Sequence, residues 1–477
     1  MGTGHFARVS AVADILSRAG DTEVILITSG EGAALVREFF PADITVLSLA
    51  PDDIGAKAAL RALTNMGWVP DVVFLDQYGS VPEWEMLAAN ADIPLVVLDD
   101  LDSATMADVI VRPHGGNWSG RSAIVLRGPS YLPLSRHITD LARRSSHRAS
   151  SRLRLNICFG GSDPTGETAK ALQAVAALEE LEVDLVVGPS AQINPVLIKK
   201  AEQMPHVTLC QAPSQEKLAE LMFSADLALG AGGVMLWERL CLRVPSLVIS
   251  VAQNQRAQID KMVEAGAIRF LGGHEEVTPD KIAQAIMALA ADEHERKAIA
   301  EAGQKLLDGR GALRLASWIR ALALGVREVK IEDASNLLNW RTDGVNWRHN
   351  FETSEKPSLD AHMSWLTAKL ANPDCIFRIV MRETEPVGVV RFDINTEDRS
   401  AYLSIYLVPE WHGQKMGLPV YLAAERELRR SRQCVNKIVS RIHKANAASE
   451  RLHRDAGFEI SASQDCADWL DAWKLLD

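Results

Sequence analysis

The chain opens with MGTGHFARV, in which glycine stands directly before a histidine. Glycine lets a backbone approach a ligand closely, and a helix that starts after such a turn directs its first amides toward an anion. Histidine titrates near neutral pH, so His5 is of a residue type suited to proton transfer. The alternative is a surface or helix-capping histidine close to a chain end.

A second glycine turn follows an apolar stretch in CFGGSDPTGETAKAL. Gly160 and Gly161 allow close approach of the backbone, and the hydroxyls of Ser162 and Thr165 are suited to an anion. The pattern predicts contact with a phosphate. A plain turn between a strand and a helix is the alternative.

A third turn, GAGGVMLWER, combines glycines with a carboxylate inside the expected helix. The amides of Gly232 and Gly233 and the helix dipole are suited to a diphosphate, and Glu238 is placed to meet ribose hydroxyls. The next apolar run ends in AQNQ, which returns Asn254 and Gln255 to the same edge. A glycine-packed helix start with Glu238 in solvent is the structural alternative.

Carboxylates end two apolar runs near the N-terminus, in LDQYG and LVVLDD. After the first run, Asp76 is placed to orient His5, and Tyr78 to contact a sugar or a water. After the second run, adjacent side chains of an extended segment point to opposite faces, so only one of Asp99 and Asp100 is expected to face a ligand. Loop structure and helix capping are the alternatives.

Residues so far apart need elements that bring them to one edge. Apolar runs alternate with helical or loop segments from residue 6 to about 140, and the alternation restarts at LRLNICFGGSD and continues to about 325. Continuous β-branched runs separated by helices indicate parallel sheets covered on both faces. We therefore predict the α/β fold class, with Rossmann-like domains over residues 1–145 and 146–326 and ligands at the carboxyl ends of their strands.

The last third of the chain has a different pattern. Strand-like runs such as IFRIVMRET, PVGVVRFDIN and AYLSIYLVPE follow one another directly, and a helix, a strand and a helix come after them. This order predicts an α+β domain over residues 327–477. The segment PEWHGQKMGL precedes its long helix, where successive amides are suited to a pyrophosphate.

Composition narrows the classes of protein. A chain of 477 residues has room for about three domains, and its net charge of −11 argues against nucleic acid or an anionic membrane as a partner. No apolar stretch reaches the length of a membrane span and no signal-peptide pattern is seen, so we expect a cytoplasmic location. The scattered cysteines and the aspartate pair complete no ligand set, so we expect no metal.

The order of GTGHFAR, DQYG, DDLDSATMADVIV, LRGPSYLPL, FGGSDPTG and GAGGVMLWER resembles the UDP-sugar hydrolases of pseudaminic acid biosynthesis, which are similar to MurG-like glycosyltransferases. The resemblance covers residues 1 to about 325. It implies a GT-B arrangement and attack of water, without a metal, on the anomeric carbon of UDP-2,4-diacetamido-2,4,6-trideoxy-β-L-altropyranose. The family has a strand before Gly-x-Gly-His that this chain omits, so we expect the N-terminal sheet to lack its first strand.

The same resemblance assigns roles to individual residues. It makes His5 the general base, with Asp76 and Tyr78 as further catalytic residues. It implies that the UDP-sugar is held by Gly4, Arg8, Asp100, Tyr131, Gly160, Gly161, Ser162, Gly232, Gly233, Val234, Glu238, Asn254 and Gln255.

The segments YLVPEWHGQKMGLPVYLAAERELRR and SRIHKANAASERLHRDAGFEI resemble the GNAT acetyltransferases, which implies acetyl-CoA as a cosubstrate. His412 stands where that family has Arg or Gln, and Lys415 replaces the middle glycine of the loop, whereas Gly417 keeps the last small residue. His453 takes the place of the tyrosine that protonates the coenzyme A thiolate; histidine can donate that proton too. The implied ligands of acetyl-CoA are Leu407, Val408, His412, Gly413, Lys415, Met416, Gly417, Leu418 and Asn446.

The two resemblances are consistent, because the pathway acetylates the 4-amino group of a UDP-linked sugar and then hydrolyses the product. We expect one chain to carry out both steps, with a UDP-amino sugar and acetyl-CoA as its partners. Two other functions stay open. One is a glycosyltransferase that uses the same cleft with an acceptor in place of water, and the other is a non-catalytic UDP-sugar-binding module joined to a working acetyltransferase. For the acetyl-CoA loop a degenerate remnant is the alternative, and for His453 a position on the helix surface.

Overall fold

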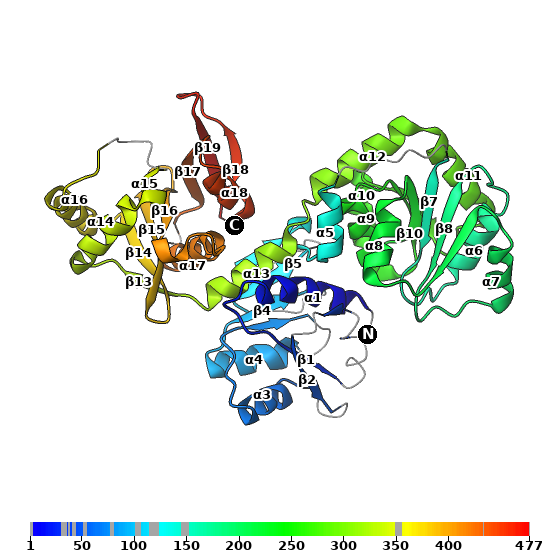
Figure 1. Cartoon of the computed structure of the whole chain (residues 1–477), viewed down its shortest axis with the longest axis horizontal. Coiled ribbons are helices and arrows are strands. Elements are labelled where there is room, and N and C mark those ends of the chain that lie inside the picture. Colours follow the sequence, from blue (N-terminus) through cyan, green and yellow to red (C-terminus); the bar gives the residue numbers. More distant parts are fainter. Residues whose placement is uncertain are drawn as a thin grey trace.

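The computed structural model describes residues 3–29, 36, 39–40, 44–50, 55–76, 81–100, 106–113, 124–144, 152–348, 355–432 and 434–476, and of residues 3 and 254 only the backbone. Figure 1 shows three units: an N-lobe (α1 to β6, blue to cyan), a C-lobe (β7 to α12, mostly green) and a third unit (β13 to β19, yellow to red). Helix α13 lies between the N-lobe and the third unit.

The N-lobe contains only parallel strand pairs among its described residues. Strand β1 pairs with β2, and the order β3-β4-β5-β6 forms a second sheet; no ladder between β1 and β3 is recorded in the described part of this lobe. All residues of β4 and β5 are buried, as expected for strands covered on both faces. The elements are α1 (Thr3–Ser17), β1 (Ile25–Ser29), β2 (Thr45–Leu49), α3 (Ala56–Asn65), β3 (Val73–Leu75), α4 (Val81–Ala91), β4 (Leu95–Leu98), β5 (Val109–Arg112) and β6 (Ile124–Arg127).

The C-lobe is a six-stranded parallel sheet in the order β12-β11-β10-β7-β8-β9. The order reverses beside β7, and such a switch point opens a crevice at the carboxyl ends of the central strands. Two large apolar cores lie in this lobe, one around Leu155 and Leu229 and one around Trp237 and Leu240, with a small cluster at Cys158, Val186 and Leu221. The elements that lead into it or form it are η1 (Pro129–Tyr131), α5 (Arg136–Ala142), β7 (Arg154–Cys158), α6 (Glu167–Val175), β8 (Glu182–Val187), α7 (Pro195–Glu202), β9 (Val207–Gln211), α8 (Gln215–Phe223), β10 (Leu227–Ala231), α9 (Val234–Cys241), β11 (Ser246–Ser250), η2 (Gln253–Gln255), α10 (Arg256–Glu264), β12 (Arg269–Gly273), α11 (Pro279–Ala291) and α12 (Glu293–Leu306).

The third unit is built on a mixed sheet in the order β13-β14-β15-β16-β17-β19-β18. All its pairs are antiparallel except β16 with β17. Its elements are β13 (Gly325–Glu328), η3 (Ile331–Asp333), α14 (Ala334–Thr342), α15 (Gly344–Arg348), α16 (Leu359–Ala371), β14 (Cys375–Arg382), β15 (Glu385–Asn395), β16 (Ser400–Leu407), η4 (Pro409–Trp411), α17 (Gly417–Ser431), β17 (Lys437–His443), α18 (Ala447–Asp455), β18 (Glu459–Ala462) and β19 (Trp469–Leu475). The predicted fold class, two parallel α/β lobes followed by an α+β unit, is confirmed.

Helix α13 (Gly311–Leu322) belongs to two cores at once. It packs against α1 on one side and α17 on the other, and a single apolar cluster joins Val12, Trp318 and Val420. Buried residues occur all round the helix, as expected for a helix enclosed by protein. The N-lobe and the third unit are therefore packed on one shared helix, whereas the cores of the C-lobe are separate.

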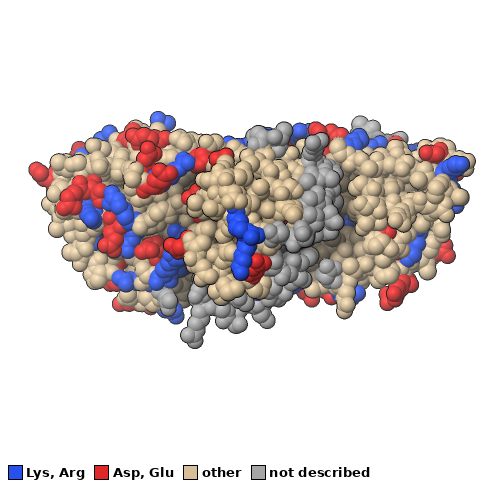
Figure 2. Space-filling model, turned by 90° about the horizontal axis from the view of Figure 1, so that it is seen from below, with Lys and Arg blue, Asp and Glu red and all other residues tan. Residues whose placement is uncertain are grey.

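The surface carries mixed charge on the face drawn in Figure 2, where Lys and Arg alternate with Asp and Glu among the described residues. In the part of the chain that the structure describes, no helix is both long enough and apolar enough to cross a membrane.

Candidate functional sites

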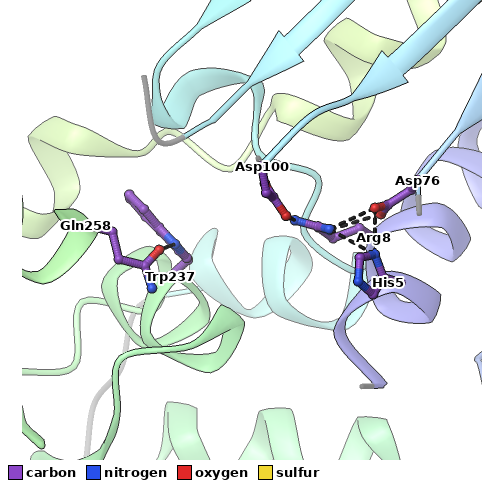
Figure 3. Close-up of polar contacts among 6 residues, drawn as sticks. All are labelled: His5, Arg8, Asp76, Asp100, Trp237 and Gln258. Atoms are coloured by element: carbon purple, nitrogen blue, oxygen red, sulfur yellow. Dashed lines mark hydrogen bonds and ion pairs between the residues drawn. The ribbon is translucent and has the colours of Figure 1, made fainter. Parts of the chain in front are cut away.

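His5 lies inside a helix rather than in a turn before one, because α1 already begins at Thr3. His5 and Arg8 are three residues apart and therefore share a face of α1. Both reach Asp76, which directly follows β3: Nδ1 of His5 lies 2.7 Å from Oδ1, and Nη2 and Nε of Arg8 lie 2.8 and 3.0 Å from Oδ1 and Oδ2 (Figure 3). The structure thus brings the predicted base and its predicted orienting carboxylate together.

The protonation of His5 follows from its two neighbours. Nδ1 lies 2.7 Å from an oxygen of Asp76 and 3.1 Å from Nη2 of Arg8. A guanidinium accepts no hydrogen bond, and the carboxylate is the closer group, so the geometry favours a proton on Nδ1 that is donated to Asp76. Nε2 is then the basic nitrogen of the ring, which is the arrangement a general base requires.

Arg8 links α1 to carboxylates that follow two strands of the N-lobe. Its Nη1 donates to Oδ2 of Asp100 at 2.7 Å, in addition to the bonds to Asp76. The side chain is buried; burial lowers the pKa of Arg8, but Asp76 and Asp100 together raise it above its ordinary value. Arg8 therefore fixes the carboxylates around His5, and contact of Arg8 or Asp100 with a UDP-sugar remains a prediction.

Asp99 makes a different contact from its neighbour. Its Oδ2 accepts from Nη2 of Arg112 on β5 at 2.9 Å, and both side chains are buried. Asp99 and Asp100 therefore serve different partners, as the alternation of an extended segment predicts.

The first turn of α1 touches the glycine turn of the C-lobe. A Cβ added to Gly4 would lie 3.1 Å from Cγ2 of Val234, the first residue of α9. A side chain at position 4 would therefore press against Val234, and glycine makes this close approach easy. Because His5 is the next residue, the His5–Asp76 pair stands at the junction of the two lobes.

Two glutamines lie beside the turn that precedes α9, and one of them bonds to it. Nε2 of Gln258 donates to the carbonyl of Gly232, while Oε1 of Gln258 accepts from Trp237 Nε1 at 3.3 Å (Figure 3). Oε1 of Gln255 would lie 3.4 Å from a Cβ on Gly232, and its Nε2 would lie 3.8 Å from a Cβ on Gly233. The structure thus places Gln255 beside the predicted diphosphate turn, as expected, and adds Gln258, which sequence reasoning missed although it follows Gln255 at helical spacing.

Glu238 is buried in α9, so the alternative of a glutamate in solvent is wrong. Burial raises the pKa of Glu238 to about 7, although Arg239 lowers it in part. Arg239 donates from Nη2 to the carbonyl of Ala231 at 2.8 Å, and a Cβ on Gly230 would lie 2.1 Å from its Nη1. Packing of this arginine explains Gly230 without any ligand, and the ribose contact of Glu238 remains a prediction.

The turn after β7 has the backbone freedom that its glycines suggested. Gly160 has a φ of 98°, which favours glycine, and Ser162 is exposed in the same turn. Sequence reasoning missed Asp163, whose carboxylate accepts from the amides of Glu167 and Thr168 at 2.9 Å and so caps α6. The two glycines and Ser162 thus precede a capped helix at the switch point of the sheet.

A hollow of about 280 Å³ lies where β11 and β12 end, and Ser250, Gln253, Gly273 and His274 are among its lining residues. Sequence reasoning singled out the neighbouring AQNQ but not Ser250 or His274. The position of each residue at the end of an apolar run is the sequence feature that could have identified them.

Three residues predicted for the hydrolase site are not seen near the His5–Asp76 pair in the described part of the chain. Tyr78 and the side chain of Asn254 lie outside the described residues. Tyr131 approaches the third unit: its hydroxyl would lie 4.0 Å from a Cβ on Gly457. Burial and the nearby Glu425 raise the pKa of Tyr131 to about 12.

The third unit has an opening between two parallel strands. β16 and β17 are paired only from Ser400–Tyr402 to Lys437–Val439, so the later part of β16 is not paired with β17 among the described residues. The next residues are those predicted to bind acetyl-CoA, from Leu407 and Val408 at the end of β16 through the loop to Gly417 and Leu418 at the start of α17.

Two residues of that loop have left-handed backbone: Gly413 with a φ of 79° and Lys415 with a φ of 57°. Met416 is buried, and His412, the first residue of the loop, has an extended conformation. On the next strand–helix connection, Asn446 caps α18 by accepting from the amide of Ser449 at 3.0 Å.

His453 is buried in α18, so its alternative as a surface histidine is wrong. Its Nδ1 lies 2.8 Å from the carbonyl of Ser449, and its ring packs edge-on to Phe458. Nε2 is buried without a hydrogen-bond partner. Burial lowers the pKa of His453, which disfavours the imidazolium that would have to donate a proton from Nε2. The role of thiolate acid stays a prediction, and this geometry argues against it at neutral pH.

Residues 323–459 match the family described as the acetyltransferase (GNAT) domain. The third unit is a GNAT domain. A second similarity is to the spore coat polysaccharide biosynthesis protein SpsG of Bacillus subtilis, with 24% identity over 264 residues, which covers 53% of this chain and 77% of that protein.

Two further proteins are similar to this chain. The uncharacterized protein MJ1062 of Methanocaldococcus jannaschii is 21% identical over 406 residues, which covers 82% of this chain and 80% of that protein. The structure of Acinetobacter baumannii MurG aligns with a TM-score of 0.48 and 16% identity, covering 67% of this chain and 97% of that one. Within the described ranges, no group of three or more His, Cys, Asp or Glu side chains is placed to hold a metal ion.

Proposed function

We propose that this chain is a bifunctional enzyme of nucleotide-sugar metabolism. The junction of the N-lobe and the C-lobe hydrolyses UDP-2,4-diacetamido-2,4,6-trideoxy-β-L-altropyranose, and the GNAT domain acetylates the 4-amino group of the UDP-linked precursor with acetyl-CoA. The observation that carries the hydrolase proposal is the pairing of His5 with Asp76 directly beside the contact of Gly4 with Val234.

Hydrolysis needs a base on one side of the anomeric carbon and a stabilised leaving group on the other. Nε2 of His5 takes a proton from water while the water oxygen bonds to the anomeric carbon. The bond from that carbon to the diphosphate oxygen breaks, and UDP leaves with the electron pair. Asp76 accepts a hydrogen bond from Nδ1–H and stabilises the imidazolium that forms.

The C-lobe is suited to hold the leaving group. In this proposal the amides of Gly232 and Gly233 and the N-terminus of α9 face the diphosphate, which gains charge as the bond breaks. The hollow near His274 is at the carboxyl edge of the same sheet, where the nucleoside of UDP would lie.

The GNAT domain offers a place for each part of acetyl-CoA. The edge of β16 beyond Tyr402, which is paired with β15 but not with β17 among the described residues, is available to the pantetheine chain. The loop from His412 to Gly417 is available to the pyrophosphate. The amine of the sugar attacks the acetyl carbonyl, the carbon–sulfur bond breaks and the nitrogen loses a proton. The thiolate takes up one proton in exchange and leaves as coenzyme A.

The test incubates the purified chain with acetyl-CoA and the UDP-amino sugar and follows thiol, UDP and free sugar separately. We expect thiol first, followed by UDP and free sugar in equal amounts without any added acceptor. We also expect His5→Ala to reduce the rate of UDP release by about 10²- to 10⁴-fold, the usual contribution of a general base. His137→Ala, a change of an exposed histidine on α5, is the matched control and should leave both activities unchanged.

Each other outcome assigns a different function. Sugar transfer that appears only with an added acceptor would identify a glycosyltransferase. Absence of UDP release from both the unaltered chain and His5→Ala, with thiol release intact, would identify a binding module joined to an acetyltransferase. Unchanged UDP release in His5→Ala would remove His5 from the mechanism.

A further inference from the structure

The loop before α17 holds a backbone conformation that its sequence does not favour. Lys415 has a φ of 57°, in the left-handed region where a side chain is strained and glycine is not. Such a conformation persists only where surrounding groups determine it. A group that holds Lys415 is therefore expected next to the loop.

Arg320 of α13 is that group. Its Nη1 donates to the carbonyl oxygen of Lys415 at 3.3 Å, and its Nη2 lies 2.7 Å from Sδ of Met416. The Arg320 side chain is only 9% exposed, so its guanidinium has little freedom to move away. One arginine thus contacts both residues that immediately precede α17, although it lies before the first residue of the GNAT match.

Asp21 of the N-lobe also binds this arginine. Its Oδ2 accepts from Nη2 of Arg320 at 2.6 Å, and its backbone carbonyl accepts from Nη2 of Arg382 on β14 at 2.8 Å. Asp21 follows α1, the helix that carries His5 in its first turn. A continuous set of polar contacts therefore runs from the N-lobe through α13 to the loop.

We propose that Arg320 is a positioning residue for acetyl-CoA: it holds the carbonyl of Lys415 so that the loop amides keep the geometry that binds the pyrophosphate. The proposal rests on the proposed function, because it takes this loop to be the acetyl-CoA site. It further means that the N-lobe, through Asp21, contributes to cosubstrate binding by the GNAT domain.

The test is a double-mutant cycle on the full chain, with the dissociation constant for acetyl-CoA measured by calorimetry in the absence of any sugar. Arg320→Ala should raise this constant about tenfold, the loss expected for a charge-assisted hydrogen bond. In a Lys415→Gly background, where the left-handed conformation is unstrained, the same change should raise it less than about threefold. Lys415→Gly also removes the lysine ammonium, but it does so with and without Arg320. The effect of losing that charge therefore cancels when the two backgrounds are compared.

Two further variants keep the result interpretable. Asp21→Asn keeps the shape of the side chain but removes the charge that binds Arg320. It should raise the dissociation constant for acetyl-CoA by a smaller factor than Arg320→Ala does. Arg430→Ala removes an exposed arginine that crosses the same interface to Asp108 at 3.8 Å, and should leave the constant unchanged. Thermal unfolding of each variant shows whether the fold is retained.

The outcomes are distinguishable. No binding of acetyl-CoA by the unaltered chain would refute the proposed acetyltransferase function and this inference with it. Binding by the unaltered chain with the same constant in folded Arg320→Ala would refute the inference alone. An equal loss in both backgrounds would show that Arg320 acts on the ligand directly and not through Lys415.

Discussion

Two glycines of the C-lobe are closely surrounded by other residues, which their sequence pattern does not show. The glycines of GAGG stand where ligand contact was predicted, but Gly230 and Gly232 also have packing reasons. A Cβ on Gly230 would collide with Arg239, and one on Gly232 would lie 2.5 Å from Cδ1 of Ile259. A glycine-rich turn can therefore be required by the protein and by a phosphate at once, and the sequence alone does not separate the two causes.

Glu238 gives a pH-dependent prediction at this scale. Its pKa is raised by burial from about 4.5 to about 7, so the folded chain binds more protons than the unfolded chain between these values. The free energy of unfolding should therefore fall as the pH rises from about 4.5 to about 7, by at most about 3 kcal/mol. Glu238→Gln should remove this slope and make the C-lobe more stable than the parent at pH 8.

Urea unfolding of the parent and the variant between pH 5 and 8 measures this difference. Glu202→Gln, an exposed position on α7 of the same lobe, is the control and should keep the slope of the parent. A parent whose free energy of unfolding rises over this interval would contradict the prediction.

The helices and strands of the GNAT domain are joined by buried charges as well as by apolar packing. Glu425 on α17 is fully buried; Nζ of Lys474 on β19 lies 2.6 Å from its Oε2, and Nη2 of Arg429 lies 2.8 Å from its Oε1. Burial would raise the pKa of Glu425, but the two cations lower it to about 2. Its contribution to stability is therefore present above about pH 4.5 and lost as the pH falls toward 2.

Removing one partner of this group should be costly. Lys474→Met leaves a buried carboxylate with less compensation, and we expect the free energy of unfolding of the GNAT domain to fall by about 3–5 kcal/mol at pH 7. Adding Glu425→Gln should recover part of this loss. Guanidinium unfolding followed by tryptophan fluorescence measures both changes, and a loss below about 1 kcal/mol in Lys474→Met would contradict the assignment.

Most elements could be predicted from the sequence, because continuous apolar runs such as VDLVVG and LVVLDD leave little choice for a parallel strand. The pairing of Asp76 with His5 was also predictable, since the carboxyl ends of parallel strands share an edge with the helix starts. The contact of Arg320 with Asp21 was not: the two residues are 299 positions apart and neither belongs to a motif. The burial of Glu238 was also missed, because a carboxylate in a helix was expected to face either a ligand or solvent.

At the scale of the whole molecule, the shared core around α13 is the feature that the sequence concealed. The segment ALRLASWIRALALG is apolar on several faces, which is compatible with the last helix of the second domain as well as with a helix enclosed between two others. The structure shows the second arrangement, with Trp318 buried between the N-lobe and the GNAT domain.

This arrangement predicts which parts unfold together. Trp318→Ala should destabilise the N-lobe and the GNAT domain jointly, by about 3–5 kcal/mol, because a large side chain is removed from their common core. Scanning calorimetry should show one transition moving to lower temperature while the transition of the C-lobe stays in place. Leu289→Ala, in a core confined to the C-lobe, should do the reverse. Two independent shifts for the N-lobe and the GNAT domain would contradict a shared core.

The double membership of α13 decides where this polypeptide could be divided or recombined. A graft that exchanges the acetyltransferase portion after Leu324 would present a foreign α17 to a helix shaped for the native one, and would leave Arg320 without the loop it contacts. A chimaeric protein that folds has to contain the segment from Gly311 onward together with the residues of α1 that pack against it. The unit of exchange in this protein is therefore larger than the portion that sequence comparison outlines.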